Sequence, residues 1–141
     1  MPFGVDDLAG FLAGRWRLER EIVDAAGAPV GSFSGVGVFS PCEGGLEYRE
    51  DGVLELGSHR GPAFRCLRYL VSGACAQVWF SDGSWFHDLD LRSGRWRVVH
   101  PCRADEYRGE FVVLDADRWR QEWRVSGPVK DYAMVTVLRR G

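Results

Sequence analysis

The sequence lacks the features that would direct the chain into or across a membrane. It contains no apolar run near the roughly 20 residues that a membrane-spanning helix needs. Its first 14 residues carry two acids and no basic residue, unlike a secretory signal peptide. The four cysteines show no Cys-x-x-Cys spacing. We therefore predict a cytoplasmic protein with reduced thiols and no membrane partner.

Common catalytic and nucleotide-binding motifs are also missing. There is no Walker-type glycine loop, dinucleotide fingerprint, Gly-x-Ser-x-Gly elbow or His-Glu-x-x-His pair. The formal net charge is only −2, and basic residues are interleaved with acidic ones, which predicts solvated strand faces and no nucleic-acid partner. No resident cofactor is expected, and the 141 residues are predicted to form one domain, 1–141.

What the sequence has instead is a series of short segments in which apolar and polar residues alternate. Such alternation is typical of half-buried strands, and turn signals separate the segments about every ten residues. A short helix capped by Asp6 or Asp7 is predicted to run to about Leu12. Ten strands are predicted after it: Arg15–Asp24, Val30–Phe39, Leu46–Leu56, Ala63–Val71, Cys75–Ser81, Ser84–Leu91, Arg95–Cys102, Tyr107–Leu114, Trp119–Val125 and Tyr132–Arg139.

Many short strands predict an antiparallel sandwich or a barrel. The predicted inward faces mix aromatic with polar side chains, such as Trp16 with Arg20 and Trp123 with Gln121. Polar groups suit a barrel lumen better than a dry sandwich core. We therefore predict an all-β, antiparallel barrel of about 8–10 strands. The last strand would pair with the first and remove the free edges.

The sixth and seventh predicted strands form a hairpin around the Ser93-Gly94 turn. In the register that this turn sets, His87 lies opposite His100 on the buried face. Asp90 lies opposite Arg97 on the exposed face, as an ion pair worth at most about 1 kcal/mol.

The two histidines have several interpretations. Imidazole titrates near neutral pH, so an inward pair would serve as acid, base or ligand contact. Both rings would otherwise be structural, each hydrogen-bonded within the lumen. A zinc site that includes Cys102 would need a bulge, because Cys102 lies about 7 Å from His100 on an extended strand. Tyr107, across a short loop, would orient a histidine or bond a ligand oxygen.

The segment Phe11–Trp16 resembles the Gly-x-Trp start of the calycin superfamily, which includes lipocalins, fatty-acid-binding proteins and haem-binding nitrobindins. The resemblance implies a calycin-like barrel with Trp16 at its closed end and Arg139 or Arg140 packed on that ring. A related haem barrel uses a histidine near the chain end, whereas this sequence has none after His100.

Longer stretches resemble a bacterial domain family of unknown function within that superfamily, and no activity is implied by this resemblance. They are Phe11–Arg20, Phe86–Leu91, His100–Cys102, Asp105–Gly109 and Gly127–Tyr132.

From the residues and the resemblance together we expect a barrel that binds a small hydrophobic or aromatic molecule in an aromatic lumen. Three alternatives stay open. In the first, the lumen is the active site of a cofactor-free isomerase or cyclase that acts on a hydrophobic, polyketide-like substrate. In the second, the barrel binds haem or a metal. The third alternative is a barrel filled by its own side chains. Monomer and homodimer are both compatible with the sequence.

The candidate site residues all come from predicted inward faces. Arg68 would meet either Glu50 or a ligand carboxylate. The candidate catalytic residues are His87, His100 and Tyr107, and the candidate ligand-binding residues are Trp85, Trp96, Cys102, Phe111, Trp119, Gln121, Trp123, Tyr48 and Arg68.

Overall fold

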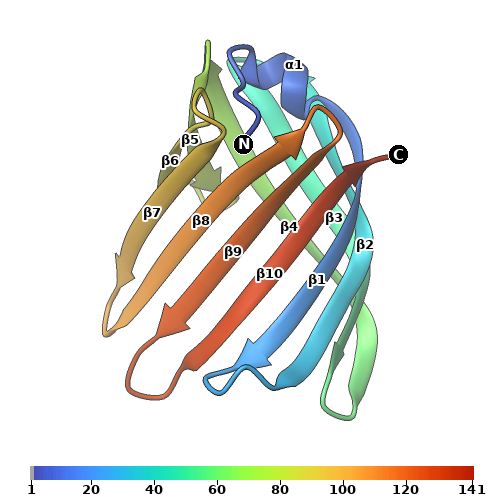
Figure 1. Cartoon of the computed structure of the whole chain (residues 1–141), viewed down its shortest axis with the longest axis vertical. Coiled ribbons are helices and arrows are strands. Elements are labelled where there is room, and N and C mark those ends of the chain that lie inside the picture. The colour runs from blue at the N-terminus through green and yellow to red at the C-terminus, as the bar shows by residue number, and fades with distance from the viewer. Residues whose placement is uncertain (1) are drawn as a thin grey trace.

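The computed structural model describes residues 2–141 and shows an antiparallel, ten-stranded β-barrel with one short helix at one end (Figure 1). The predicted fold class, helix and strands are confirmed. The elements are α1 (Leu8–Leu12), β1 (Gly14–Asp24), β2 (Pro29–Cys42), β3 (Gly45–Leu56), β4 (His59–Ser72), β5 (Cys75–Phe80), β6 (Trp85–Asp90), β7 (Arg95–Cys102), β8 (Asp105–Asp115), β9 (Arg118–Ser126) and β10 (Asp131–Arg140).

The sheet begins at β6 and runs through β5, β4, β3, β2 and β1 to β10, β9, β8 and β7. As predicted, the last strand pairs with the first, with Trp16 opposite Arg140 and Asp24 opposite Tyr132. Helix α1 and both chain termini lie at the same end of the barrel (Figure 1). The hairpins β1–β2, β3–β4 and β9–β10 lie at the other end, which we call the open end.

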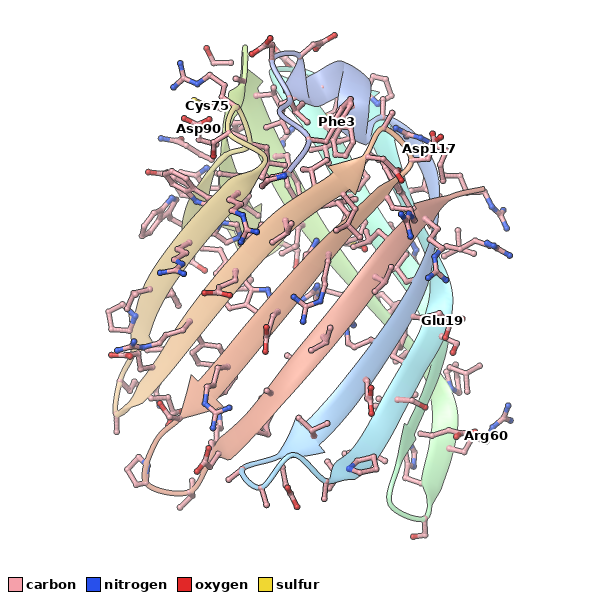
Figure 2. The ribbon with its side chains drawn as sticks, viewed as in Figure 1. Phe3, Glu19, Arg60, Cys75, Asp90 and Asp117 are labelled. Carbon is pink, nitrogen blue, oxygen red and sulfur yellow. The ribbon has the colours of Figure 1, made fainter. Side chains whose placement is uncertain are left out.

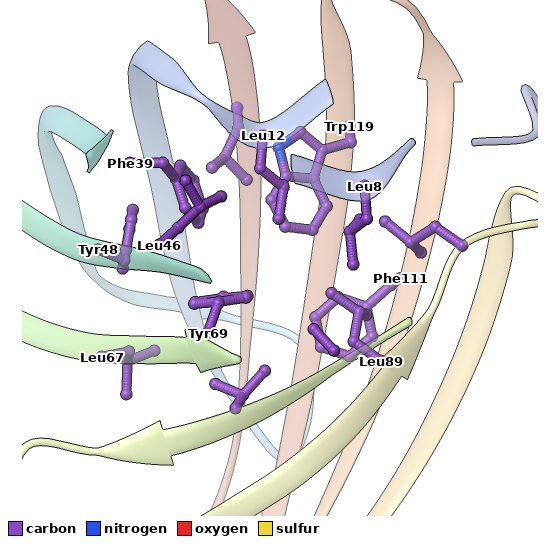
Figure 3. Close-up of a cluster of buried hydrophobic side chains, with 14 of the residues drawn as sticks. Leu8, Leu12, Phe39, Leu46, Tyr48, Leu67, Tyr69, Leu89, Phe111 and Trp119 are labelled. Atoms are coloured by element: carbon purple, nitrogen blue, oxygen red, sulfur yellow. The ribbon is translucent and has the colours of Figure 1, made fainter. Parts of the chain in front are cut away.

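The end of the barrel beneath α1 is closed by a packed hydrophobic core. Asp7 caps the helix by accepting a hydrogen bond from the Gly10 amide at 3.0 Å. Trp16 is fully buried, and the Arg140 guanidinium lies 3.9 Å from the centre of its ring. The expected place of Trp16 is therefore confirmed. Figure 3 shows neighbouring members of this core, among them Leu8, Leu12, Phe39, Leu46, Leu89, Phe111 and Trp119.

Strands β6 and β7 form a seam, because no backbone ladder joins them within residues 2–141. The predicted hairpin is therefore wrong, and the pairing of last and first strands does not remove every edge. At the closed end, the N-terminal segment makes backbone hydrogen bonds in place of a β6–β7 ladder. The amide of Val5 donates to the Leu91 carbonyl, and the amide of Phe3 donates to the Val113 carbonyl, both at 2.9 Å.

Further along the seam, side chains donate the hydrogen bonds that a backbone carbonyl on the edge of β6 would otherwise lack. The Asp88 carbonyl accepts hydrogen bonds from Trp96 Nε1 at 2.8 Å and from His87 Nδ1 at 2.7 Å. Trp96 belongs to β7, so its indole joins the two edges without a backbone ladder. A carbonyl that already has two donors needs no amide from the opposite strand.

The predicted ion pair between Asp90 and Arg97 is also wrong, since its two residues lie on the unpaired edges. Asp90 pairs with Arg92 in the following turn, at 2.8 Å. Arg97 pairs with Glu110 on β8, its neighbour in the ladder, at 3.1 Å.

A bulge in β6 changes which side chains face the lumen. Val78 pairs with His87 and Trp79 pairs with Trp85, so Phe86 is an extra residue on β6. Phe86 and His87 both point inward, whereas Trp85 is 46% exposed. The predicted inward position of Trp85 is therefore wrong.

The outer face of the barrel is polar, as alternation predicts. Figure 2 shows Glu19 and Arg60 pointing away from the strands, and both are exposed. In the described part of the chain, no helix is long and apolar enough to cross a membrane.

Candidate functional site

A charged cluster lies inside the barrel and is centred on Glu50, which is only 2% exposed. Its carboxylate accepts hydrogen bonds from Arg20 Nη1 and Nη2, at 3.0 and 3.1 Å, and from the Tyr48 hydroxyl at 2.7 Å. Arg65 Nε lies 3.3 Å from Glu50 Oε1 without forming a hydrogen bond. Arg20 Nε donates to Thr136 Oγ1 at 2.8 Å. One carboxylate therefore stands against two guanidinium groups.

Strand register brings these groups together. Arg20 lies opposite Thr136 in the β1–β10 ladder, and Glu50 lies opposite Arg65 in the β3–β4 ladder. Gly37 on β2 leaves room for the Tyr48 ring, because a Cβ atom at this glycine would lie 2.8 Å from that ring. The cluster is thus assembled from five adjacent strands, the consecutive strands β1 to β4 and the last strand, β10.

The cluster keeps Glu50 ionised. Burial opposes ionisation, but the hydrogen bonds and charges of Arg20 and Arg65 outweigh it and lower the pKa of Glu50 below its usual value. Burial, reinforced by the negative charge of Glu50, raises the pKa of the Tyr48 phenol, so Tyr48 stays a hydrogen-bond donor. The ionised cluster has one negative and two positive charges, a net charge of +1.

A cavity of about 480 Å³, the mouth cavity, lies at the open end beside this cluster. Its walls come from the adjacent strands β10, β1, β2, β3 and β4. Apart from the charged pair Arg20 and Glu50, the walls are apolar or aromatic: Ile22, Val30, Phe33, Leu54, Leu56, Ala63, Phe64, Tyr132 and Met134. The cavity can hold a mainly apolar molecule with a polar group at its inner end.

His87 lies in an aromatic cluster formed by β6, β8 and β9. Its ring centre is 4.6 Å from that of Phe86, 5.3 Å from that of Phe111 and 5.5 Å from that of Trp123. Phe86 and Trp123 stack on each other with centroids 5.0 Å apart. None of these four residues lines the mouth cavity.

The chemistry of His87 follows from its burial. Nδ1 must carry a proton to donate to the Asp88 carbonyl, so the neutral ring has its lone pair on Nε2. Burial lowers the pKa of His87 to about 4; the charges of His100 and Arg65 also lower it, and the contacts with Asp88 oppose this. At neutral pH His87 is therefore uncharged, with Nδ1 as a hydrogen-bond donor and Nε2 as an acceptor.

His100 is partly exposed and contacts several rings. Its nearest aromatic neighbour is Phe86, at 5.4 Å between ring centres, so both histidines touch Phe86 instead of facing each other across a ladder. As expected, Tyr107 lies opposite His100, here in the β7–β8 ladder. The Tyr107 hydroxyl accepts a hydrogen bond from Lys130 at 3.4 Å. Catalytic roles for the histidines and Tyr107 stay predictions.

The predicted pairing of Arg68 with Glu50 is wrong. Arg68 is exposed on the outer face, and Arg65 takes the inner place. Alternation along β4 turns Ala63, Arg65 and Leu67 inward. If the inward face of this strand had been assigned from Ala63 and Leu67, the same alternation would have predicted that Arg65 points inward.

The remaining predicted ligand contacts are scattered. Phe111 and Trp123 join His87, Tyr48 joins Glu50, and Gln121 lies opposite Thr136 in the β9–β10 ladder. Four other residues lie outside both clusters: Trp85 and Cys102, which are exposed, Trp96 at the seam, and Trp119, packed against Trp16 at the closed end.

The described chain holds no group of three or more His, Cys, Asp and Glu side chains arranged to bind a metal ion. Cys102 is exposed, and its ladder partner is Asp105. The zinc arrangement considered from the sequence therefore does not form.

Comparison with known proteins places residues 12–140 in the family described as "Family of unknown function (DUF6314)". No curated protein matches the sequence. The S-type phycobiliprotein lyase CPES from Guillardia theta has a similar structure, with a TM-score of 0.67 and 8% identity over 99% of this chain and 93% of that one.

Two further solved structures share the barrel. A protein of unknown function from the DUF3598 family of Nostoc punctiforme PCC 73102 has a TM-score of 0.60 and 11% identity, over 99% of this chain and 51% of that one. The protein EF1p2_mFAP2b bound to DFHBI has a TM-score of 0.53 and 11% identity, over 97% of this chain and 99% of that one. At these identities the likeness is one of fold.

Proposed function

The chain belongs to the DUF6314 family of unknown function, and we propose that its barrel binds a small, mainly apolar or aromatic molecule in the mouth cavity. One observation carries this proposal: a cavity of about 480 Å³ with apolar walls and a charged pair, Arg20 and Glu50, on its surface. Sites for small molecules are typically concave and mostly apolar, with a few polar groups that orient the ligand.

The packing of the barrel supports binding from the open end. At the other end Trp16, Trp119 and two residues of α1, Leu8 and Leu12, fill the interior and are buried. A molecule that enters the lumen would therefore meet the apolar walls first and the Glu50 cluster further in.

Solved structures of similar barrels also support the binding of a small molecule. EF1p2_mFAP2b is described as bound to DFHBI, and another structural relative is a phycobiliprotein lyase. Because the likeness lies in the fold, it supports a ligand inside a barrel and does not identify the ligand.

In this proposal Arg20 and Glu50 supply the polar contacts, because they line the mouth cavity. His87, His100 and Tyr107 pack among aromatic rings, and we place them beyond the ligand. The proposed location is a reducing cytoplasm, which suits the four cysteines present as thiols.

The proposal is tested with a neutral fluorescent probe, N-phenyl-1-naphthylamine, whose emission rises in apolar surroundings. We expect the protein to bind it and Leu54→Trp, which fills the mouth cavity with an indole, to weaken binding at least about tenfold. Val38→Trp is the matched control, since Val38 lies on the outer face of β2. Absence of binding, or equal binding by both variants, would contradict the proposal.

A further inference from the structure

We propose that the molecule bound in the mouth cavity carries one acidic group and that Arg65 binds this group. The inference rests on the proposed function and specifies the chemical class of its ligand: an apolar or aromatic body with a single carboxylate, sulfonate or phosphate.

The charges inside the barrel do not balance. Glu50 is the buried acid of the cluster, and it faces both Arg20 and Arg65. Each nitrogen of Arg20 has a partner, since Nη1 and Nη2 donate to Glu50 and Nε donates to Thr136. Arg65 has only an ion-pair contact with Glu50, so it is the less satisfied of the two cations.

Arg65 is also incompletely hydrogen-bonded. Its Nε atom is buried, and it has no hydrogen-bond partner among residues 2–141. Its 3.3 Å contact with Glu50 is an ion pair only. The Arg65 side chain is 40% exposed, so part of it remains accessible from outside the packed interior.

Arg65 is adjacent to residues that line the mouth cavity, although it is not itself one of them. Its neighbours Ala63 and Phe64 on β4, and its ladder partner Glu50 on β3, all line that cavity. The charge of Arg65 also acts on His87, which lies on β6, two strands away from β4 in the sheet. The guanidinium thus lies close to residues that line the mouth cavity and near enough to His87 to affect its pKa.

An acidic ligand fits this arrangement better than a neutral or basic one. A planar guanidinium binds carboxylate, sulfonate or phosphate oxygens through paired hydrogen bonds. A single negative charge would neutralise the cluster. A basic ligand would be repelled by the net positive charge, and Glu50 already accepts from Arg20 and Tyr48.

Two probes with the same body test the inference. 1-Anilinonaphthalene-8-sulfonate is N-phenyl-1-naphthylamine with one added sulfonate. We expect the wild-type protein to bind the sulfonate at least about tenfold more tightly than the neutral probe at neutral pH and moderate salt.

Substitutions then identify the residue responsible. Arg65→Gln should abolish the preference for the sulfonate and leave the affinity for the neutral probe within about twofold. Arg65→Lys keeps the charge and should retain part of the preference. Arg68→Gln is the matched control, because Arg68 lies on the same strand and faces outward. It should change neither affinity.

The outcomes separate this inference from the proposed function. If neither probe binds the wild-type protein, the proposed function is wrong. If the neutral probe binds but the sulfonate has no advantage, or Arg65→Gln weakens both probes equally, the function stands and the acidic ligand is rejected. Circular dichroism of each variant shows whether it is folded. If Arg65→Gln is not folded, the inference is tested with Arg65→Lys, which should retain part of the preference for the sulfonate.

Discussion

Buried polar side chains tie the stability of this barrel to pH. Glu50 has a pKa below its usual value, so its contribution is present above the ordinary carboxyl pKa and is lost as the pH falls through the lowered value. His87 has its pKa lowered to about 4 from 6.5. Between these two values the unfolded chain binds a proton that the folded protein does not, so stability must fall as the pH falls through this range.

We therefore predict that the free energy of unfolding decreases by about 3 kcal/mol between pH 6.5 and pH 4, at about 1.4 kcal/mol for each pKa unit. His87→Asn keeps a donor for the Asp88 carbonyl and should remove most of this decrease. Urea unfolding at a series of pH values measures it.

His59→Asn, at the exposed start of β4, is the control and should leave the pH dependence as it is in the wild-type protein. The groups that act on His87 are Asp88, His100 and Arg65. A wild-type profile that is flat between pH 6.5 and pH 4 would refute the assignment.

At the scale of elements, the strands of the barrel differ in whether one or both of their edges are paired. Strands β1 and β10 pair with neighbours on both sides, whereas β6 and β7 each have one paired edge in the described chain. Pro101 on β7 and Trp96, whose indole bonds to Asp88, suit an edge that does not accept another strand. The seam is therefore the part of the wall expected to open at the lowest free energy.

Hydrogen exchange checks this expectation. Amides of β6 and β7 should exchange faster than those of β1 and β10. Trp96→Phe, which removes the bond to the Asp88 carbonyl, should speed exchange in β6 further, by the roughly fivefold that about 1 kcal/mol allows. Trp79→Phe is a matched control, because Trp79 Nε1 has no hydrogen-bond partner in residues 2–141. Equal protection of all four strands would contradict the seam.

At the scale of the whole molecule, one residue near the chain end joins several parts of the fold. The Arg140 guanidinium packs on Trp16 and donates hydrogen bonds to the carbonyls of Phe11 and Ala13, at 2.6 and 3.0 Å. These contacts link β10 to the segment that closes the barrel. Hydrogen bonds from a charged group contribute more than those between neutral groups.

We predict that Arg140→Met lowers the free energy of unfolding by about 2–4 kcal/mol. Arg139→Met, next to it on the exposed face, should change it by less than about 0.5 kcal/mol. Urea unfolding at neutral pH compares the two variants. Similar losses for both would mean that the contacts of Arg140 are not responsible.

The sequence by itself determined the elements, the fold class and the closed end. Alternation with period two marks each strand, because neighbouring side chains on a strand point to opposite faces. The last strand, predicted as Tyr132–Arg139, was found in this way, and β10 extends it by one residue at each end. The place of Trp16 at the closed end was what the family resemblance implied, and that resemblance was confirmed by the match over residues 12–140.

The tertiary structure alone decided which inward groups meet and where space is left. The seam between β6 and β7 depends on an N-terminal segment distant in the sequence, and the inward turn of Phe86 depends on a bulge that alternation does not reveal. Glu50 meets Arg65 through the register of the β3–β4 hairpin and meets Arg20 across the intervening strand β2. Local periodicity tells which face a side chain is on, whereas its partners across a lumen depend on how the whole sheet curves.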